Sequence, residues 1–312
     1  MEVGGDAIPR LMERLEQRMR SLAQENGPLL ARYAGDTIAA GGKRLRPLLV
    51  CLSAGVPPPE TEALVRAAVA VELVHAATLV HDDVLDGSSL RRGRPTVVAA
   101  AGRLLATATG DLLFSRAFAE LAGAGSADAV RVLSRASSEL AEGELMQRAD
   151  AYAPGVSVER YLERCRLKTA VLFRAACSLG ALEGGAELTS LGTFGEQIGV
   201  AFQILDDVLD VSGPPERTGK PVGTDLLDGT VTLPLILARQ RDSDLAALDL
   251  RRLPPAEAAA VCQRITATGA LDLARKRAFE LVTAAKGSLP ELPPRQRTAL
   301  ELVADGVVER YS

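Results

Sequence analysis

The stretch from Glu72 to Asp86, ELVHAATLVHDDVLD, carries the features that decide the fold. It is apolar along most of its length and ends in three aspartates, Asp82, Asp83 and Asp86. Asp82 and Asp86 are four residues apart, so on a helix they lie about one turn apart on the same face. The stretch therefore predicts an apolar helix with a crowded acidic end.

The rest of the chain repeats the helical pattern. Ala, Leu, Arg and Glu dominate, and apolar residues recur at three- and four-residue spacing with few β-branched alternations. Gly- and Pro-rich loops such as residues 53–60 and 87–95 separate these stretches, and none is a long low-complexity linker. We expect an all-α protein of about ten or more helices in a single domain, residues 1–312. The polar segment 212–223 has the composition of a mobile lid.

Composition excludes several classes of protein. The net charge is −4, aromatic residues make up 3% and there is no Trp, so no nucleic-acid partner is expected. The four cysteines are scattered without a Cys-x-x-Cys pair, which argues against disulfides and zinc and favours a reducing compartment. We find no signal-peptide pattern and no apolar run of about 18 residues. The expectation is a cytoplasmic protein without a membrane span.

The aspartate pattern occurs twice, because Asp206-Asp207-Val208-Leu209-Asp210 repeats the five residues that begin at Asp82. Carboxylates at this spacing repel one another and are costly at the end of an apolar helix unless a cation neutralises them. Oxygen ligands without Cys or His suit Mg²⁺, which bridges to substrate phosphates. The alternative is a solvated acidic patch at each helix end. Two copies with apolar approaches favour the metal.

Basic residues alternate with the acidic clusters along the chain. They occur in four groups: Lys43, Arg44 and Arg46; Arg91 and Arg92; Lys168; and Lys220. Each group by itself is more typical of a solvated surface. Together they suggest a bound diphosphate, held by Arg and Lys directly and by carboxylates through Mg²⁺. His75 lies seven residues before Asp82, on the same helical face, and is either a ligand contact or an ordinary core or surface residue.

These motifs resemble the polyprenyl synthetase family, of the trans-isoprenyl diphosphate synthase type that makes medium or long chains. The resemblance covers residues 40–240 and rests on order and spacing: GGKRLRP at 41–47, DDVLD at 82–86, RRG at 91–93, GD at 110–111, GE at 143–144 with Gln147, KTA at 168–170, FQILDDVLD at 202–210, GK at 219–220 and TLP at 232–234. Terpene cyclases share the first aspartate motif, but their second metal motif is of another type.

The resemblance implies a role for each matching residue. It assigns Mg²⁺, three ions per site, to five aspartates: Asp82, Asp83, Asp86, Asp206 and Asp210. Asp207 supports the second cluster, while Thr169 and Gln203 line the reacting centre. The residues that contact the allylic diphosphate are Arg91, Lys168 and Lys220. Those that form the isopentenyl diphosphate site are Lys43, Arg46, His75 and Arg92.

The resemblance also implies the architecture and the reaction. The fold is a large antiparallel helical bundle around a central substrate cavity, and relatives pair as homodimers. The enzyme joins isopentenyl diphosphate head to tail to an allylic diphosphate and releases an all-trans polyprenyl diphosphate. Three alternatives stay open: a short-chain farnesyl or geranylgeranyl diphosphate synthase, a terpene cyclase or head-to-head coupling enzyme, and a non-catalytic synthase subunit. Intact aspartate clusters argue against the last.

Product length depends on the side chains below the first aspartate. Relatives with short products often carry an aromatic residue four or five positions before it, where this chain has Thr78 and Ala77. The growing chain threads down a tunnel along this helix, and Val74, further down, is not aromatic either. We therefore predict a product longer than geranylgeranyl diphosphate. The candidates for the floor of this tunnel are Phe114 and Phe118, one turn apart. These five side chains are otherwise ordinary helix-packing residues.

One position departs from the family pattern. Thr230 stands where relatives usually carry a lysine that contacts diphosphate. A neutral hydroxyl cannot neutralise charge, and charge-assisted hydrogen bonds are about twice as strong as neutral ones. We therefore expect weaker retention of the allylic diphosphate, or another cation in its place.

Overall fold

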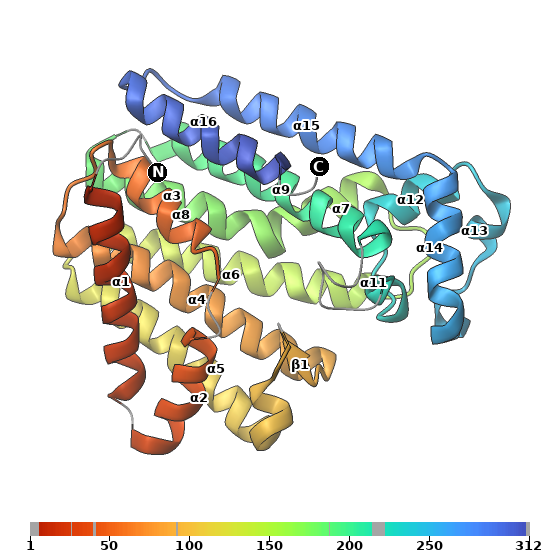
Figure 1. The fold of residues 1–312 in the computed structure, drawn as a ribbon, viewed down its shortest axis with the longest axis horizontal. Helices are drawn as coiled ribbons and strands as arrows, with labels where there is room; N and C mark the ends of the chain where they lie inside the picture. The colour runs from red at the N-terminus through yellow and green to blue at the C-terminus, as the bar shows by residue number, and fades with distance from the viewer. Residues whose placement is uncertain are drawn as a thin grey trace. The chain divides into compact units, whose positions relative to one another are not determined.

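The structure is a computed structural model of the chain (Figure 1). It describes residues 6–25, 27–39, 42–91, 93–186, 188–213 and 222–309. These residues form almost only helices, which confirms the all-α prediction. In chain order the elements are α1 (Ala7–Gln24), α2 (Gly27–Ala39), α3 (Leu45–Ala54), α4 (Glu62–Asp86), β1 (Leu90–Arg91), β2 (Arg94–Pro95), α5 (Val97–Gly123), α6 (Ala127–Asp150), α7 (Val158–Cys165), the π-helix η2 (Arg166–Ala170), α8 (Val171–Gly184), α9 (Leu188–Ser212), α11 (Thr224–Leu227), α12 (Leu233–Arg239), α13 (Ser243–Ala247), the 3₁₀-helices η3 (Leu250–Arg252) and η4 (Pro255–Glu257), α14 (Ala258–Ala267), α15 (Ala270–Ser288) and α16 (Pro294–Glu309).

The chain divides into two compact units that are interleaved in the sequence. The first unit comprises residues 1–137, 172–195 and 289–300, and the second comprises the remainder. The first aspartate cluster belongs to the first unit and the second cluster to the second unit. The expectation of one domain over residues 1–312 stays a prediction.

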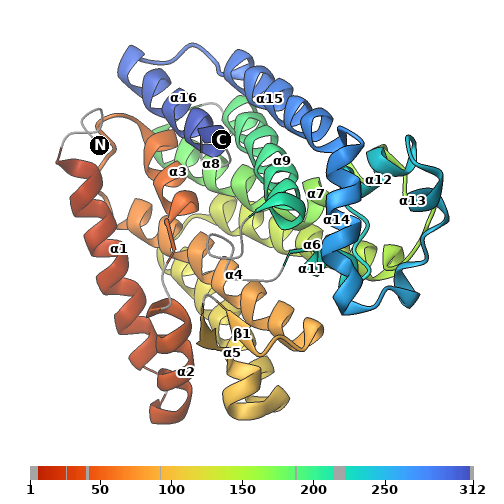
Figure 2. The same ribbon diagram turned by 45° about the vertical axis from the view of Figure 1, so that its right-hand side comes forward.

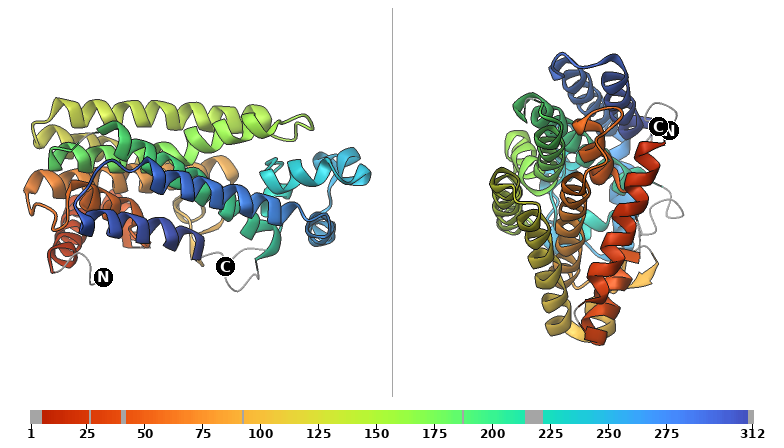
Figure 3. Two further views of the ribbon diagram at one scale, coloured as in Figure 1. Left: turned by 90° about the horizontal axis from the view of Figure 1, so that it is seen from above. Right: turned by 90° about the vertical axis from the view of Figure 1, so that its left-hand side faces the viewer.

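Helix α4 is the core of the first unit. Its N-terminus is capped by Thr61, whose hydroxyl accepts a hydrogen bond from Leu64 N at 3.2 Å. Its C-terminus ends at Gly87, which has a φ of +63° and donates its N–H to Asp83 O. Apolar residues surround the whole helix because it is buried on all sides. Helix α1 runs beside it, as the right-hand view of Figure 3 shows.

Two helices of the first unit correct one expectation from the sequence. By length and composition α4 and α5 are apolar enough to cross a membrane, with mean hydropathies of 1.7 and 1.4. In the most apolar 18-residue stretch of α4, 72% is buried inside the protein, as in the core helix of a soluble domain. In the corresponding stretch of α5, 28% is buried. The expectation that the chain contains no apolar run of this length is therefore wrong. Burial in the core accounts for the apolar run in α4. The absence of a membrane span stays a prediction.

Small residues allow α3 and α8 to approach closely within the first unit. A Cβ atom at Gly180 would lie 2.2 Å from Val50 O, and one at Gly184 would lie 2.2 Å from Ala54 O. Any larger residue at these two positions would push the helices apart. Gln296 adds a buried hydrogen bond from its side-chain nitrogen to Leu52 O at 2.9 Å. These contacts hold the C-terminal half of α3, the helix that follows the first basic motif.

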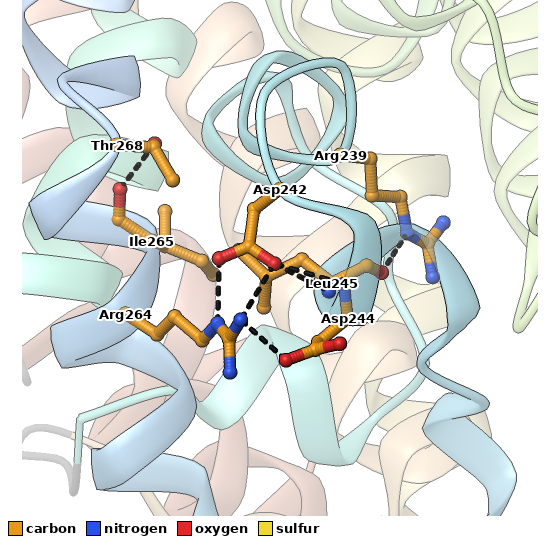
Figure 4. A network of polar contacts seen from close by, with 7 residues as sticks. All are labelled: Arg239, Asp242, Asp244, Leu245, Arg264, Ile265 and Thr268. Atoms are coloured by element: carbon orange, nitrogen blue, oxygen red, sulfur yellow. Dashed lines mark hydrogen bonds and ion pairs between the residues drawn. The ribbon is translucent and has the colours of Figure 1, made fainter.

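The second unit packs α12 against α14 and α15 (Figure 2). Asp242 caps α13 by accepting hydrogen bonds from Asp244 N and Leu245 N. Arg264 of α14 donates to the carboxylates of both Asp242 and Asp244 (Figure 4). The Arg264 guanidinium lowers the pKa of Asp242. This charged network fastens α13 to α14, and its residues lie outside the sequence motifs described above.

Candidate active site

The first aspartate cluster lies at the C-terminal end of α4, as the sequence predicts. Asp83 is buried, whereas Asp82 is partly buried and Asp86 is exposed. The Nε and Nη2 atoms of Arg91 both lie 2.8 Å from Asp83 Oδ1. Arg91 is the second residue of β1 in the short β1–β2 hairpin, so the loop after α4 folds back onto the cluster. Arg92 lies outside the described residues.

His81 links the first cluster to α5. Its Nε2 lies 3.3 Å from Asp111 Oδ1, and its ring stacks on Phe114 with the ring centres 5.8 Å apart. A Cβ atom at Gly110 would lie only 2.2 Å from His81 Nε2, so this contact requires glycine. The sequence motifs predict no role for His81. Its position directly before Asp82, together with the Gly110-Asp111 pair, is the sequence signal for this contact.

The basic segment before α3 contains two arginines with different environments. Arg44 has a φ of +47° and donates to Glu16 at 2.6 Å and to Glu72 at 2.8 Å. Burial lowers the pKa of Arg44, but the two glutamates outweigh this effect and raise it. Arg44 is therefore a structural residue. Glu72, which stands below His75 on α4, is its partner.

Arg46 has no such partner. Its Nε is buried without a hydrogen bond, and no carboxylate within the described ranges forms an ion pair with it. The guanidinium lies over the ring of Phe173, 4.5 Å from the ring centre. Burial lowers the pKa of Arg46 to about 10, although Glu72 opposes the shift. A buried cation of this kind is stabilised by an anionic ligand. Lys43, in the same segment, is exposed.

The second cluster lies in the last turns of α9, where Asp207 is buried and Asp206 is exposed. Tyr161 donates its hydroxyl to Asp207 Oδ2 at 2.6 Å, and Gln203 donates its side-chain nitrogen to Asp207 Oδ1 at 2.7 Å. Thr169 in turn donates to Gln203 Oε1 at 2.6 Å. The structure thus joins Thr169, Gln203 and Asp207 in one chain of hydrogen bonds. Tyr161 was missed, since nothing in its local sequence signals this contact.

The electrostatics of the second cluster favour neutral carboxyl groups in the absence of a cation. Burial raises the pKa of Asp207 to about 7, even though the hydrogen bonds from Tyr161 and Gln203 favour its charged form. Burial and the nearby Asp210 raise the pKa of Asp225 well above its usual value. Asp225 also donates its backbone N–H to Asp210 Oδ2 at 3.2 Å. Asp225 is thus a further acidic member of this cluster that sequence reasoning did not single out.

Lys168 and Thr169 lie in the π-helix η2, a type of insertion that is frequent at functional sites. The π-helix approaches α6 at Gly143, where a Cβ atom would lie 2.6 Å from Lys168 N. Lys168 donates its ammonium group to Glu144, which also accepts from Arg148 at 2.7 Å. Burial raises the pKa of Glu144, but Lys168 and Arg148 outweigh burial and lower it. The motif residues Gly143 and Glu144 therefore position Lys168.

The remaining predicted residues are placed as follows. Of the residues assigned to chain length, Val74 and Ala77 are fully buried. Thr78 is partly buried and its hydroxyl donates to His75 O. Phe114 stacks on His81, and Phe118 is partly buried. Thr230 donates its N–H to Asp225 O at 2.8 Å. Lys220 and most of the predicted lid lie outside the described residues. No group of three metal-ligating side chains converges within the described part of the chain.

Comparisons with known proteins identify the class. The sequence pattern of the family described as "Polyprenyl synthetase" matches residues 28–264. "Heptaprenyl diphosphate synthase component 2" of Geobacillus stearothermophilus is 42% identical, over 86% of this chain and 84% of that protein. "Geranylgeranyl diphosphate synthase" of Methanosarcina mazei is 36% identical, over 90% of this chain and 88% of that protein.

A solved structure agrees with these matches. The crystal structure of polyprenyl synthase from Caulobacter crescentus CB15, complexed with calcium and isoprenyl diphosphate, has a TM-score of 0.91 at 35% identity. The alignment covers 100% of this chain and 97% of that one. The chain belongs to the polyprenyl synthetase family. The predictions of an isoprenoid synthase fold and of an enzyme, a trans-polyprenyl diphosphate synthase, are confirmed.

Proposed function

We propose that the enzyme condenses isopentenyl diphosphate with an allylic diphosphate in a Mg²⁺-dependent, head-to-tail reaction. The observation that carries this proposal is Arg46, a guanidinium whose buried Nε has no hydrogen-bond partner. The ring of Phe173 supports its face, so its donors are positioned for an anion. Lys43, His75 and Arg92 complete the proposed isopentenyl diphosphate site. The allylic diphosphate is assigned to Lys168, Arg91 and Lys220. Arg92 and Lys220 are assigned by resemblance alone.

The donor set fits Mg²⁺. Each cluster provides carboxylate oxygens only, and within each cluster the middle aspartate is already held by protein donors. The resemblance assigns Asp82, Asp83 and Asp86 in the first cluster and Asp206 and Asp210 in the second as ligands of Mg²⁺. Mg²⁺ commonly takes one or two carboxylates and completes its shell with water and substrate phosphates. We propose three ions per site.

The proposed reaction breaks the allylic C–O bond and forms a C–C bond. Mg²⁺ held by the aspartates of the two clusters would draw electron density toward the departing diphosphate. Lys168 and Arg91 stabilise the same charge through hydrogen bonds. The double bond of isopentenyl diphosphate attacks the allylic carbon, and loss of a proton to the released diphosphate restores an alkene. Thr169 and Gln203, which are hydrogen-bonded to each other, line the reacting centre.

We propose a product longer than geranylgeranyl diphosphate. Support comes from the small side chains at Ala77 and Thr78 and from the heptaprenyl synthase relative, whereas the geranylgeranyl synthase relative favours a short product. Incubating the protein with Mg²⁺, excess isopentenyl diphosphate and each allylic primer, followed by mass analysis, tests both the reaction and the length. Ala77→Phe should shorten the product while leaving the first condensation intact. A wild type that stops at farnesyl or geranylgeranyl diphosphate would contradict the longer product.

A second candidate concerns the assembly. We propose a cytoplasmic homodimer, and four free, buried cysteines agree with a reducing compartment. The Geobacillus relative is named as one component of a synthase, which favours the alternative that this chain requires a different second subunit. Light scattering of the purified chain, combined with its activity alone, separates these cases. An inactive chain that is already dimeric would favour the second subunit.

A further inference from the structure

Asp207 is held from two sides by protein groups. Its Oδ1 accepts from Gln203 at 2.7 Å and its Oδ2 accepts from Tyr161 at 2.6 Å. Both oxygens thus have a protein donor, and the carboxyl group is 4% exposed. Asp207 is therefore oriented as a support, whereas its neighbour Asp206 is exposed.

Tyr161 is itself fixed. It is 1% exposed and lies in α7, one turn before the buried Cys165. The guanidinium of Arg164 lies over its ring, 5.5 Å from the ring centre. Arg164 donates to Val231 O and lies 3.4 Å from Asp150 Oδ2. Arg164, which supports the ring of Tyr161, is therefore itself held by two contacts. The hydroxyl of Tyr161 consequently points at Asp207 from a rigid base.

We propose that Tyr161 is a positioning residue for prenyl transfer, which fixes Asp207 and through it the orientation of the metal ligands Asp206 and Asp210. Partners of this kind orient ligand side chains and change affinity for the metal when they are removed. The inference rests on the proposed Mg²⁺-dependent function. It assigns a role to a tyrosine that lies 46 residues from Asp207 in the sequence.

Tyr161→Phe tests the role because it removes only the hydroxyl. Calorimetric titration with Mg²⁺, in the presence of an allylic thiodiphosphate that does not ionise, reads the metal affinity without turnover. We expect affinity and kcat to fall about ten- to hundredfold, with the KM for isopentenyl diphosphate within about twofold of wild type. Tyr33→Phe, on α2 in the first unit, is the matched control and should leave both unchanged.

A double-mutant cycle separates positioning from a general structural effect. If Tyr161 acts through Asp207, then Tyr161→Phe should cause no further loss of Mg²⁺ affinity in an Asp207→Asn background. Additive losses, or wild-type affinity and kcat in Tyr161→Phe, would overturn the inference. Turnover of isopentenyl diphosphate by the wild type is measured in parallel. Its absence would overturn the proposed function, whereas equal Mg²⁺ titrations of the wild type and Tyr161→Phe overturn the positioning role alone.

Discussion

The two aspartate clusters share the sequence DDVLD but hold their middle aspartates in different ways. Asp83 is paired with a cation, Arg91, that arrives from the next hairpin. Asp207 receives two neutral donors, Tyr161 and Gln203, from within the second unit. Arg91 balances the charge of Asp83, whereas Tyr161 and Gln203 carry no charge that could balance that of Asp207. The same five residues therefore give one cluster whose middle carboxylate is neutralised by the protein and another whose middle carboxylate is not.

The largest effect on turnover should come from the first aspartate of each cluster, Asp82 or Asp206. The two clusters are expected to behave alike in this respect. Asp82→Ala and Asp206→Ala should each lower kcat about a thousandfold or more, roughly 4 kcal/mol of transition-state stabilisation. Steady-state kinetics measure this loss, and circular dichroism checks that the variants fold. Asp272→Ala, at an exposed position on α15, is the control. Near-normal turnover in both variants would remove the metal assignment.

The pH dependence of stability should distinguish the clusters next. The pKa of Asp207 is raised to about 7, so its contribution to stability is fully present below its unfolded pKa and is lost as pH rises through 7. Metal-free wild type should lose about 2.5 kcal/mol of unfolding free energy from this group between pH 5 and pH 8. Urea unfolding in chelator at both pH values measures the loss.

Asp207→Asn should reduce this dependence, while Asp225 retains a trend of the same sign. Asp83→Asn serves as the comparison variant from the first cluster. An unchanged pH dependence in Asp207→Asn would show that the carboxyl group does not titrate in this range.

A smaller effect is expected from the cation of the first cluster. Arg91→Gln leaves Asp83 buried without its partner and should lower the unfolding free energy by about 2 kcal/mol, because the arginine is itself partly exposed. Arg94→Gln, in the same hairpin, should change stability by no more than about 0.5 kcal/mol. Equal effects of the two substitutions would mean that the pair with Asp83 contributes nothing specific.

The smallest effect should come from making the second cluster resemble the first. Thr230→Lys adds a cation next to Asp225 and should lower the KM for the allylic diphosphate about three- to tenfold. Thr230→Ser, which keeps a neutral hydroxyl, should leave this KM unchanged. A KM that stays constant or rises in the lysine variant would indicate that another cation already fills this role.

The sequence predicted the helices, both acidic clusters and the residues of the Thr169–Gln203–Asp207 chain, because local spacing and motif order specify them. It did not predict Tyr161, because the contact with Asp207 joins residues far apart in the chain and a tyrosine in an amphipathic helix has no special signature. The partners of Arg44 were missed for the same reason: Glu16 and Glu72 lie on two different helices. The sequence analysis also missed the long apolar stretch of α4, a helix whose burial on all sides gives it the composition of a membrane span.

The π-helix at Arg166–Ala170 has a consequence for how this chain tolerates length changes. Its wider turn, closed by the N–H of Val171 bonding to Arg166 O, accommodates one residue more than an α-helix would. Deleting a single residue there would restore a regular helical turn and shift the residues of the turn relative to their neighbours. Lys168 would then lose its present alignment with Gly143 and Glu144. The register of this turn is therefore as much a determinant of function as the identity of the lysine.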